Sequence, residues 1–129
     1  MPPRKQISRL VRCLGMEVDE DTFGALVEQA LDGIPPKLGK VMRNVAVFVG
    51  DEGPSPNLLG LYQGIPLTKR SASTYAGVLP DRITIYRLPI ARRARTYEEL
   101  VRQIQITVVH EVGHHFGLSD SRLHELGWG

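Results

Sequence analysis

Hydrophobic residues recur at helical spacing in two stretches near the start of the chain. The first predicts a short basic amphipathic helix over residues 6–14, with apolar positions Ile7, Leu10, Val11 and Leu14. A second helix is predicted to begin at Asp19 or Asp21, since either side chain can cap it, and to end at Gly33 before two prolines. Its apolar positions are Phe23, Leu26, Val27, Ala30 and Leu31.

The middle of the chain has patterns typical of β-strands. Residues 45–49 form a continuous β-favouring run that predicts a buried strand, and residues 59–62 indicate a second, shorter strand. Polar and apolar residues alternate from Arg82 to Leu88, which predicts a half-buried antiparallel strand. Residues 66–80 have no such period and are expected to form a long surface loop.

A long helix is predicted in the last part of the chain. Thr96 and Glu99 have the spacing of a capping box, so we expect a helix from there to Gly117, with a short final helix over residues 121–126. The apolar stripe of the long helix contains Leu100, Ile104, Val108 and Val112. The chain has no repeat or linker, so residues 1–129 are interpreted as one α+β domain, with residues 1–15 as an N-terminal helical extension.

Composition disfavours several classes of protein. The net charge is only +2, and the cluster of Arg92, Arg93 and Arg95 is interpreted as a solvated loop after Pro89, so a nucleic-acid partner is not expected. Cys13 is the single cysteine, which excludes an internal disulfide and a cysteine-rich zinc site, and we expect it to be inert packing. No apolar run suits a signal peptide or a membrane span, which favours a cytoplasmic protein without a membrane partner.

The strongest chemical signal is the segment from His110 to Asp120, which reads HExxHxxGxxD. Histidines at i and i+4 project from adjacent turns of one helix face and suit two positions of a tetrahedral zinc. Glu111 projects about 60° from His114, so it suits a general base beside the metal better than a third ligand. The alternative is an exposed helix glutamate. His115 lies in the apolar arc and is interpreted as a core histidine hydrogen-bonded within the fold.

The third ligand is predicted to follow the end of the long helix. Gly117 can adopt a left-handed conformation, so it can end the helix and return the chain toward the metal with Asp120 as ligand. Two alternatives stay open. Asp120 can instead cap the last helix, a role that Ser119 can share, and His124 or Glu125 can compete for the third position.

The same segment resembles the zincin metallopeptidases, and its spacing through Gly117 is that of the metzincin branch, in which snapalysin also has Asp as third ligand. Residues 19–128 are similar to the small bacterial zincin-like metallopeptidases, notably in LGLYQGIPL over 59–67 and LPDRITIY over 79–86. This resemblance implies a minimal zincin fold, with a small mixed sheet packed on the motif helix. It also implies zinc held by His110, His114 and Asp120, with Glu111 as the base.

Three functions are compatible with these residues. The leading hypothesis is a zinc-dependent peptidase, whose peptide or protein substrate pairs with an edge strand that we expect at residues 82–88. A metal-dependent ribonuclease is a weaker alternative, because endonucleases that mature ribosomal RNA use HxxxHxxGxxH, and here Glu111 and Asp120 replace the Gly and the last His. The non-enzymatic alternative is a zinc-stabilised or metal-free module that binds a protein partner.

Overall fold

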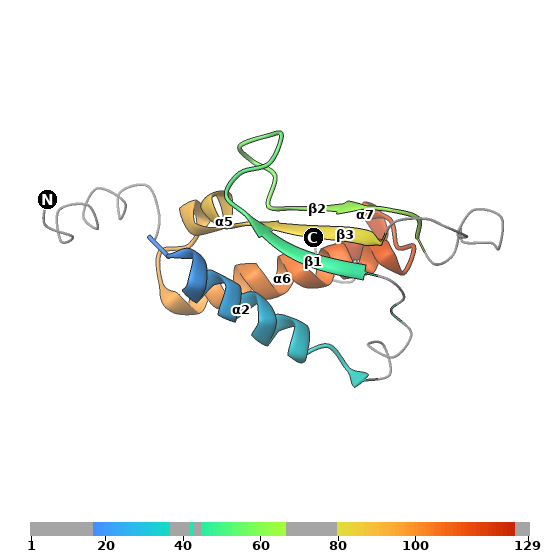
Figure 1. Cartoon of the computed structure of the whole chain (residues 1–129), viewed down its shortest axis with the longest axis horizontal. Helices are drawn as coiled ribbons and strands as arrows, with labels where there is room; N and C mark the ends of the chain where they lie inside the picture. Colours follow the sequence, from blue (N-terminus) through green and yellow to red (C-terminus); the bar gives the residue numbers. More distant parts are fainter. Residues whose placement is uncertain (1–16, 37–41, 43–44, 67–79, 126–129) are drawn as a thin grey trace, which may run out of the picture.

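The fold is that of a computed structural model, which describes residues 17–36, 42, 45–66 and 80–125 (Figure 1). Three strands form one mixed sheet, and helices α2 (Glu20–Asp32) and α6 (Tyr97–His115) lie together on one side of it. The predicted helix over residues 6–14 and residues 67–79 of the predicted loop lie outside the described residues. The predicted α+β class, with a small mixed sheet against the motif helix, is confirmed.

Strand β3 (Asp81–Tyr86) occupies the centre of the sheet. It runs parallel to β1 (Val45–Gly50) and antiparallel to β2 (Gly60–Gln63). The prediction for residues 82–88 is therefore only partly correct. Residues 82–86 are in a strand, whereas residues 87–88 begin the next helix. The strand has a neighbour on each side, so it offers no edge to a substrate. The central place of β3 in the sheet is decided by its pairing with β1 and β2, which are distant in the sequence. The alternation of polar and apolar residues does not indicate whether a strand is central or at an edge.

Strand β1 is more exposed than its apolar sequence predicts. Phe48 and Val49 are 43 % and 38 % exposed, which contradicts the prediction of a buried strand. The reason is that β1 pairs with β3 on one side only among the described residues. On the face of the sheet away from α6, the Arg82 guanidinium lies 4.5 Å from the centre of the Phe48 ring and covers part of that apolar surface.

The prediction of an arginine-rich loop is only partly correct. Arg92 and Arg93 belong to a helix, α5 (Arg87–Arg93), whereas Arg95 lies in the connection to α6. Pro89 is compatible with α5 because it lies in the first turn, where backbone N–H groups have no partner within the helix. Arg87 pairs with Asp51 at 2.9 Å, and Arg92 pairs with Glu52. The loop after β1 therefore compensates two of the positive charges in this region, which the local sequence pattern could not indicate.

The two long helices begin where their capping residues predict. The Asp19 carboxylate accepts a hydrogen bond from the Thr22 N–H at 2.7 Å, which decides between the two predicted caps of α2. At the start of α6, the Thr96 hydroxyl accepts from the Glu99 N–H at 3.1 Å. The main core lies between the helices and the sheet, and its fully buried members include Phe23, Ile83, Ile85, Ile90, Leu100, Ile104 and Val108. Within the described part of the chain, no helix is both long and apolar enough to cross a membrane.

Replacing Gly24 in the interior of α2 is predicted to stabilise the fold. A Cβ at this position would meet nothing within 4 Å, so Gly24→Ala gains helix propensity without a clash. The expected increase in the free energy of unfolding is about 0.5–1 kcal/mol, measured by chemical denaturation. The matched control is Ala25→Gly, the next residue of the same helix, which is exposed and should lose a similar amount. A loss in Gly24→Ala would contradict the described packing of α2.

Candidate metal centre

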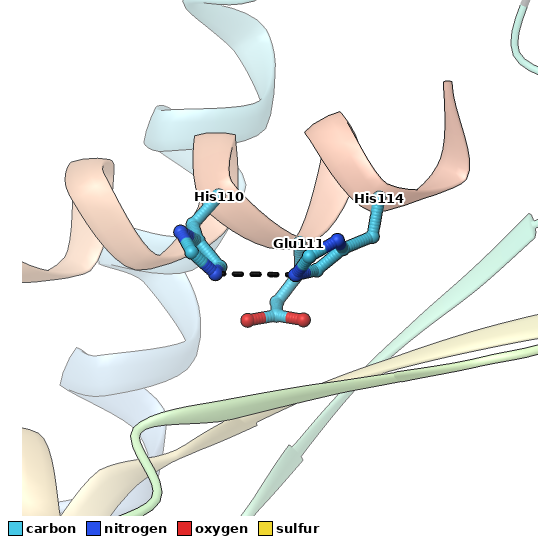
Figure 2. Close-up of side chains that lie close together, drawn as sticks. All are labelled: His110, Glu111 and His114. Carbon is cyan, nitrogen blue, oxygen red and sulfur yellow. Dashed lines mark hydrogen bonds between the residues drawn. The ribbon is translucent and has the colours of Figure 1, made fainter. Parts of the chain in front are cut away.

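Three side chains from two helices converge at the C-terminal end of α6. His110 and His114 come from α6 and Asp120 from α7 (Asp120–Glu125). The two histidine Nε2 atoms are 3.2 Å apart, and Asp120 Oδ1 lies 3.0 Å from each of them. Figure 2 shows both imidazoles and the Glu111 carboxylate projecting from α6 toward the strands.

The spacing of these three atoms fits a small cation. Ligand atoms about 2.0–2.1 Å from a tetrahedral zinc are about 3.3 Å from one another, because that is the edge of such a tetrahedron. The observed separations of 3.0–3.2 Å are close to this value. Nitrogen and carboxylate lone pairs at this distance repel unless a proton or a metal ion lies between them, so the group is suited to hold a cation.

A backbone carbonyl determines which ring nitrogen of His114 carries the proton. His114 Nδ1 lies 2.9 Å from the Leu118 oxygen, and a carbonyl only accepts, so Nδ1 carries the proton and donates it. The other ring nitrogen, Nε2, is directed at His110 and Asp120. A backbone acceptor on the far ring nitrogen is the usual support of a metal-binding histidine, because it fixes both the tautomer and the ring orientation.

Gly117 turns the chain as predicted. Its φ is +87°, in the left-handed region that favours glycine. The Gly117 N–H donates to the His114 carbonyl and the Leu118 N–H to the Gly113 carbonyl, each at 2.9 Å. These are the two bonds of a Schellman motif. The same turn therefore brings the Leu118 carbonyl under His114 and sends the chain back toward the histidines.

The structure separates the two roles that the sequence left open for Asp120. Ser119 is the cap of α7, since its hydroxyl accepts from the Arg122 N–H at 3.2 Å. Asp120 is the first residue of the helix, and its carboxylate is directed to the histidines. Glu125 pairs with Arg122 at 3.0 Å, and neither Glu125 nor His124 is among the described residues that line the cavity at the histidines.

Docking of α7 depends on Gly113, which the sequence analysis did not single out. A Cβ on Gly113 would lie 2.4 Å from Leu123 Cδ2, so α7 packs directly on the bare backbone of α6. Leu123 is 1 % exposed, which makes it the apolar anchor of α7. A glycine inside a strongly helical pattern is the signal that could have indicated this close packing.

Glu111 is buried, at 6 % exposure, so the alternative of an exposed helix glutamate is wrong. Its carboxylate lies within 4.8 Å of the ligand atoms of His110 and His114. Burial raises the pKa of Glu111 above its ordinary value, and the Asp120 charge acts in the same direction. The two histidines and a hydrogen bond from the Tyr62 backbone lower that pKa but do not reverse the shift.

Strand β2 covers Glu111 at very short range. A Cβ on Gly60 would lie 2.9 Å from Thr107 Cγ2 and 3.0 Å from Glu111 Cγ, so only glycine allows this approach. Between β2 and the end of α6 is an open cavity of about 520 Å³. Its described walls are Leu58, Gly60, Leu61, Tyr62 and Pro66 on one side, and His110, Glu111, His114 and the residues 117–120 on the other.

A second cavity, of about 450 Å³, lies on the opposite side of α6, against the C-terminal end of α2. Its described lining includes Ile34, Val109 and Phe116 and no titratable side chain. General acid–base chemistry and metal binding need such side chains, so of these two cavities the one at the histidines is the candidate site.

His115 is a buried core histidine, as predicted, with no exposed surface. Its Nδ1 lies 3.0 Å from the Asp81 carboxylate, which is itself 1 % exposed. No role was predicted from the sequence for Asp81 or for Tyr62, whose hydroxyl also donates to Asp81. Pairing between residues this far apart in the chain leaves no local pattern that could have indicated it.

A mixed sheet packed on a helix that carries HExxH, followed by a glycine turn and an aspartate, defines a small protein of the zincin class. The sequence profile of the zincin-like metallopeptidase family matches residues 42–128, and the chain belongs to that family. No curated protein matches it. Among solved structures it is similar to a conserved hypothetical protein from Thermo thermophilus, with a TM-score of 0.53 and 25% identity over 84% of this chain and 97% of that one.

Replacing Gly113 should reveal how tightly α7 is docked. Gly113→Ala is expected to destabilise the fold, because overpacking costs about 1–3 kcal/mol. In a Leu123→Ala background the clash is absent, and the same substitution should stabilise by up to about 1 kcal/mol through helix propensity. Chemical denaturation of the four proteins of this double-mutant cycle measures both effects. Stabilisation by Gly113→Ala in both backgrounds would contradict the described packing.

Proposed function

We propose that the protein is a zinc-dependent peptidase, in which His110, His114 and Asp120 hold the metal and Glu111 is the general base. The observation that carries this proposal is the set of three ligand atoms 3.0–3.2 Å apart, next to a buried carboxylate in an open cavity. Two imidazoles and one carboxylate are a donor set that zinc accepts. A tetrahedral zinc held by these three residues would keep its fourth position for water or substrate, as catalysis requires.

Asp120 fits the third ligand position better than Glu111. The carboxylate of Asp120 contacts both histidines at 3.0 Å, whereas Glu111 belongs to a looser group whose ligand atoms spread over as much as 4.8 Å. A tetrahedral site needs atoms about 3.3 Å apart. Glu111 therefore lies near the proposed metal position, but it is not needed as the third ligand.

Glu111 has the environment of a proton acceptor. When bound, zinc supplies Lewis acidity toward a substrate carbonyl and toward water. Burial under β2 raises the pKa of Glu111, and a carboxyl group tuned upward can both take a proton and return it to a leaving amine near neutral pH. The Tyr62 backbone hydrogen bond keeps the carboxylate in place while it does so.

Strand β2 is the edge on which we place a peptide substrate. It pairs with β3 on one side only among the described residues, and Gly60, Leu61 and Tyr62 line the cavity. An extended peptide can add to such an edge through main-chain hydrogen bonds. This geometry would bring a scissile carbonyl between β2 and the histidines. It replaces the expectation for residues 82–88, because β3, which contains the strand part of that segment, lies at the centre of the sheet.

The ligand set is tested by metal content and affinity. The wild-type chain is expected to bind about one zinc, measured by mass spectrometry after reconstitution in limiting metal. His114→Ala and Asp120→Ala should each weaken binding by more than the roughly 10–100-fold that loss of a supporting group costs. The matched control is His124→Ala on α7, which should leave the affinity unchanged. Equal losses in Asp120→Ala and His124→Ala would contradict the assignment of the third ligand.

The role of Glu111 is tested by Glu111→Gln, which keeps the shape of the side chain and removes the base. The variant should bind zinc at the same stoichiometry and lose about 10²–10⁴-fold in peptide cleavage, the usual contribution of general base catalysis. Cleavage is measured by mass spectrometry on an unbiased peptide library. If the variant bound zinc and kept the full biological activity of the wild type, a binding module would be the better description.

A further inference from the structure

Asp81 is a buried carboxylate with three hydrogen-bond donors. It is 1 % exposed at the start of β3. Oδ2 accepts from the Tyr62 hydroxyl and from His115 Nδ1, the latter at 3.0 Å, and Oδ1 accepts from the Ile65 N–H at 3.1 Å. A charge at this depth is tolerated only when its lone pairs are satisfied, as they are here.

The chain leaving β2 bends closely around this carboxylate. Gly64 has φ +154°, and a Cβ there would lie 2.3 Å from Asp81 Cγ. Any side chain would therefore overlap the carboxylate. The end of β2 and the start of β3 are thus joined through Asp81 in one rigid arrangement, in addition to the ladder between the strands.

The partners of Asp81 lead directly to the proposed metal centre. His115 is the neighbour of His114 and lies in the last turn of α6. Tyr62 is on β2, lines the cavity, and donates a backbone hydrogen bond to Glu111. Asp81 is not among the described residues that line the cavity, so any influence on the site passes through Tyr62 and His115.

We infer that Asp81 is a positioning residue: by holding the Tyr62 hydroxyl and His115 together, it fixes β2 against the last turn of α6 and so places Glu111 beside the metal. The functional importance of this role rests on the proposed function. The effect of Asp81 on the contact between Tyr62 and Glu111 does not need a bound metal, so it can be measured in the metal-free protein. Asp81 does not line the cavity, so a substrate or metal ion bound there would not contact it directly.

The hydrogen bonds around Asp81 are better explained by a role in positioning β2 and α6 than by a role in filling the core. Apolar residues of similar volume often stabilise a fold as well as a buried polar group does or better, so packing alone does not require a carboxylate here. A hydrogen-bonded network differs from apolar packing because it accepts only one geometry. Its donors come from β2, from the turn after β2 and from α6, the elements whose relative position determines where Glu111 lies.

The test uses the whole 129-residue chain without metal and follows the Tyr62 amide by ¹H–¹⁵N NMR. Glu111→Gln provides the reference, since it removes the charge that this amide contacts. In Asp81→Asn, the Tyr62 amide shift should move in the direction seen in Glu111→Gln, and the amide should exchange faster. Zinc affinity should fall about 10–100-fold, the range for groups that support metal ligands. The control is Val27→Ala in the α2 core, which should lower stability and leave both readouts unchanged.

The inference is overturned if Asp81→Asn lowers stability as Val27→Ala does while the Tyr62 amide and the zinc affinity stay as in the wild type. If Asp81→Asn does not fold, Tyr62→Phe replaces it, because it removes a single hydroxyl. It should shift the same amide in the same direction by a smaller amount, and no shift would overturn the inference. If the wild-type chain binds no zinc, the proposed function fails, and the amide readout in the metal-free protein still decides the role of Asp81.

Discussion

The packing of α6 against β2 and β3 is the contact on which the rest of the site depends. In its first half, α6 presents apolar residues such as Leu100 and Ile104 to the core. Near its end, the same helix buries Glu111 and His115. Burying a carboxyl and an imidazole costs free energy unless each finds a partner. Asp81 and the Tyr62 backbone supply those partners, so the polar half of α6 can pack as closely as the apolar half.

Three glycines, which carry no side chain, are as important to the site as the side chains that form it. Gly60 lets β2 approach α6 until it covers Glu111, and Gly113 lets α7 rest on the backbone of α6. Gly117 supplies the left-handed turn between the two helices. Each glycine brings a different element to the histidines. The described part of the chain therefore assembles the candidate site from one long helix, one short helix and one edge strand.

Much of this structure could be predicted from interactions between residues close together in the sequence. The caps at Asp19 and Thr96, the helix end at Gly117 and the core position of His115 all follow from interactions within a few residues or from the helical period, and all are confirmed. The errors concern features that distant residues decide. The centre of the sheet, the exposure of β1 and the helix at Arg87–Arg93 depend on strand order and on pairing with Asp51 and Glu52.

The sequence by itself determined the chemical types at the site and their local spacing, because an α-helix fixes where residues at i and i+4 project. It placed His110 and His114 on one face and a turn at Gly117. Only the tertiary structure decided that β2 is, among the described strands, the edge beside the histidines, and that Glu111 is buried. Those outcomes depend on contacts between elements far apart in the chain. The hydrophobic pattern of one helix or strand does not indicate which other element packs against it.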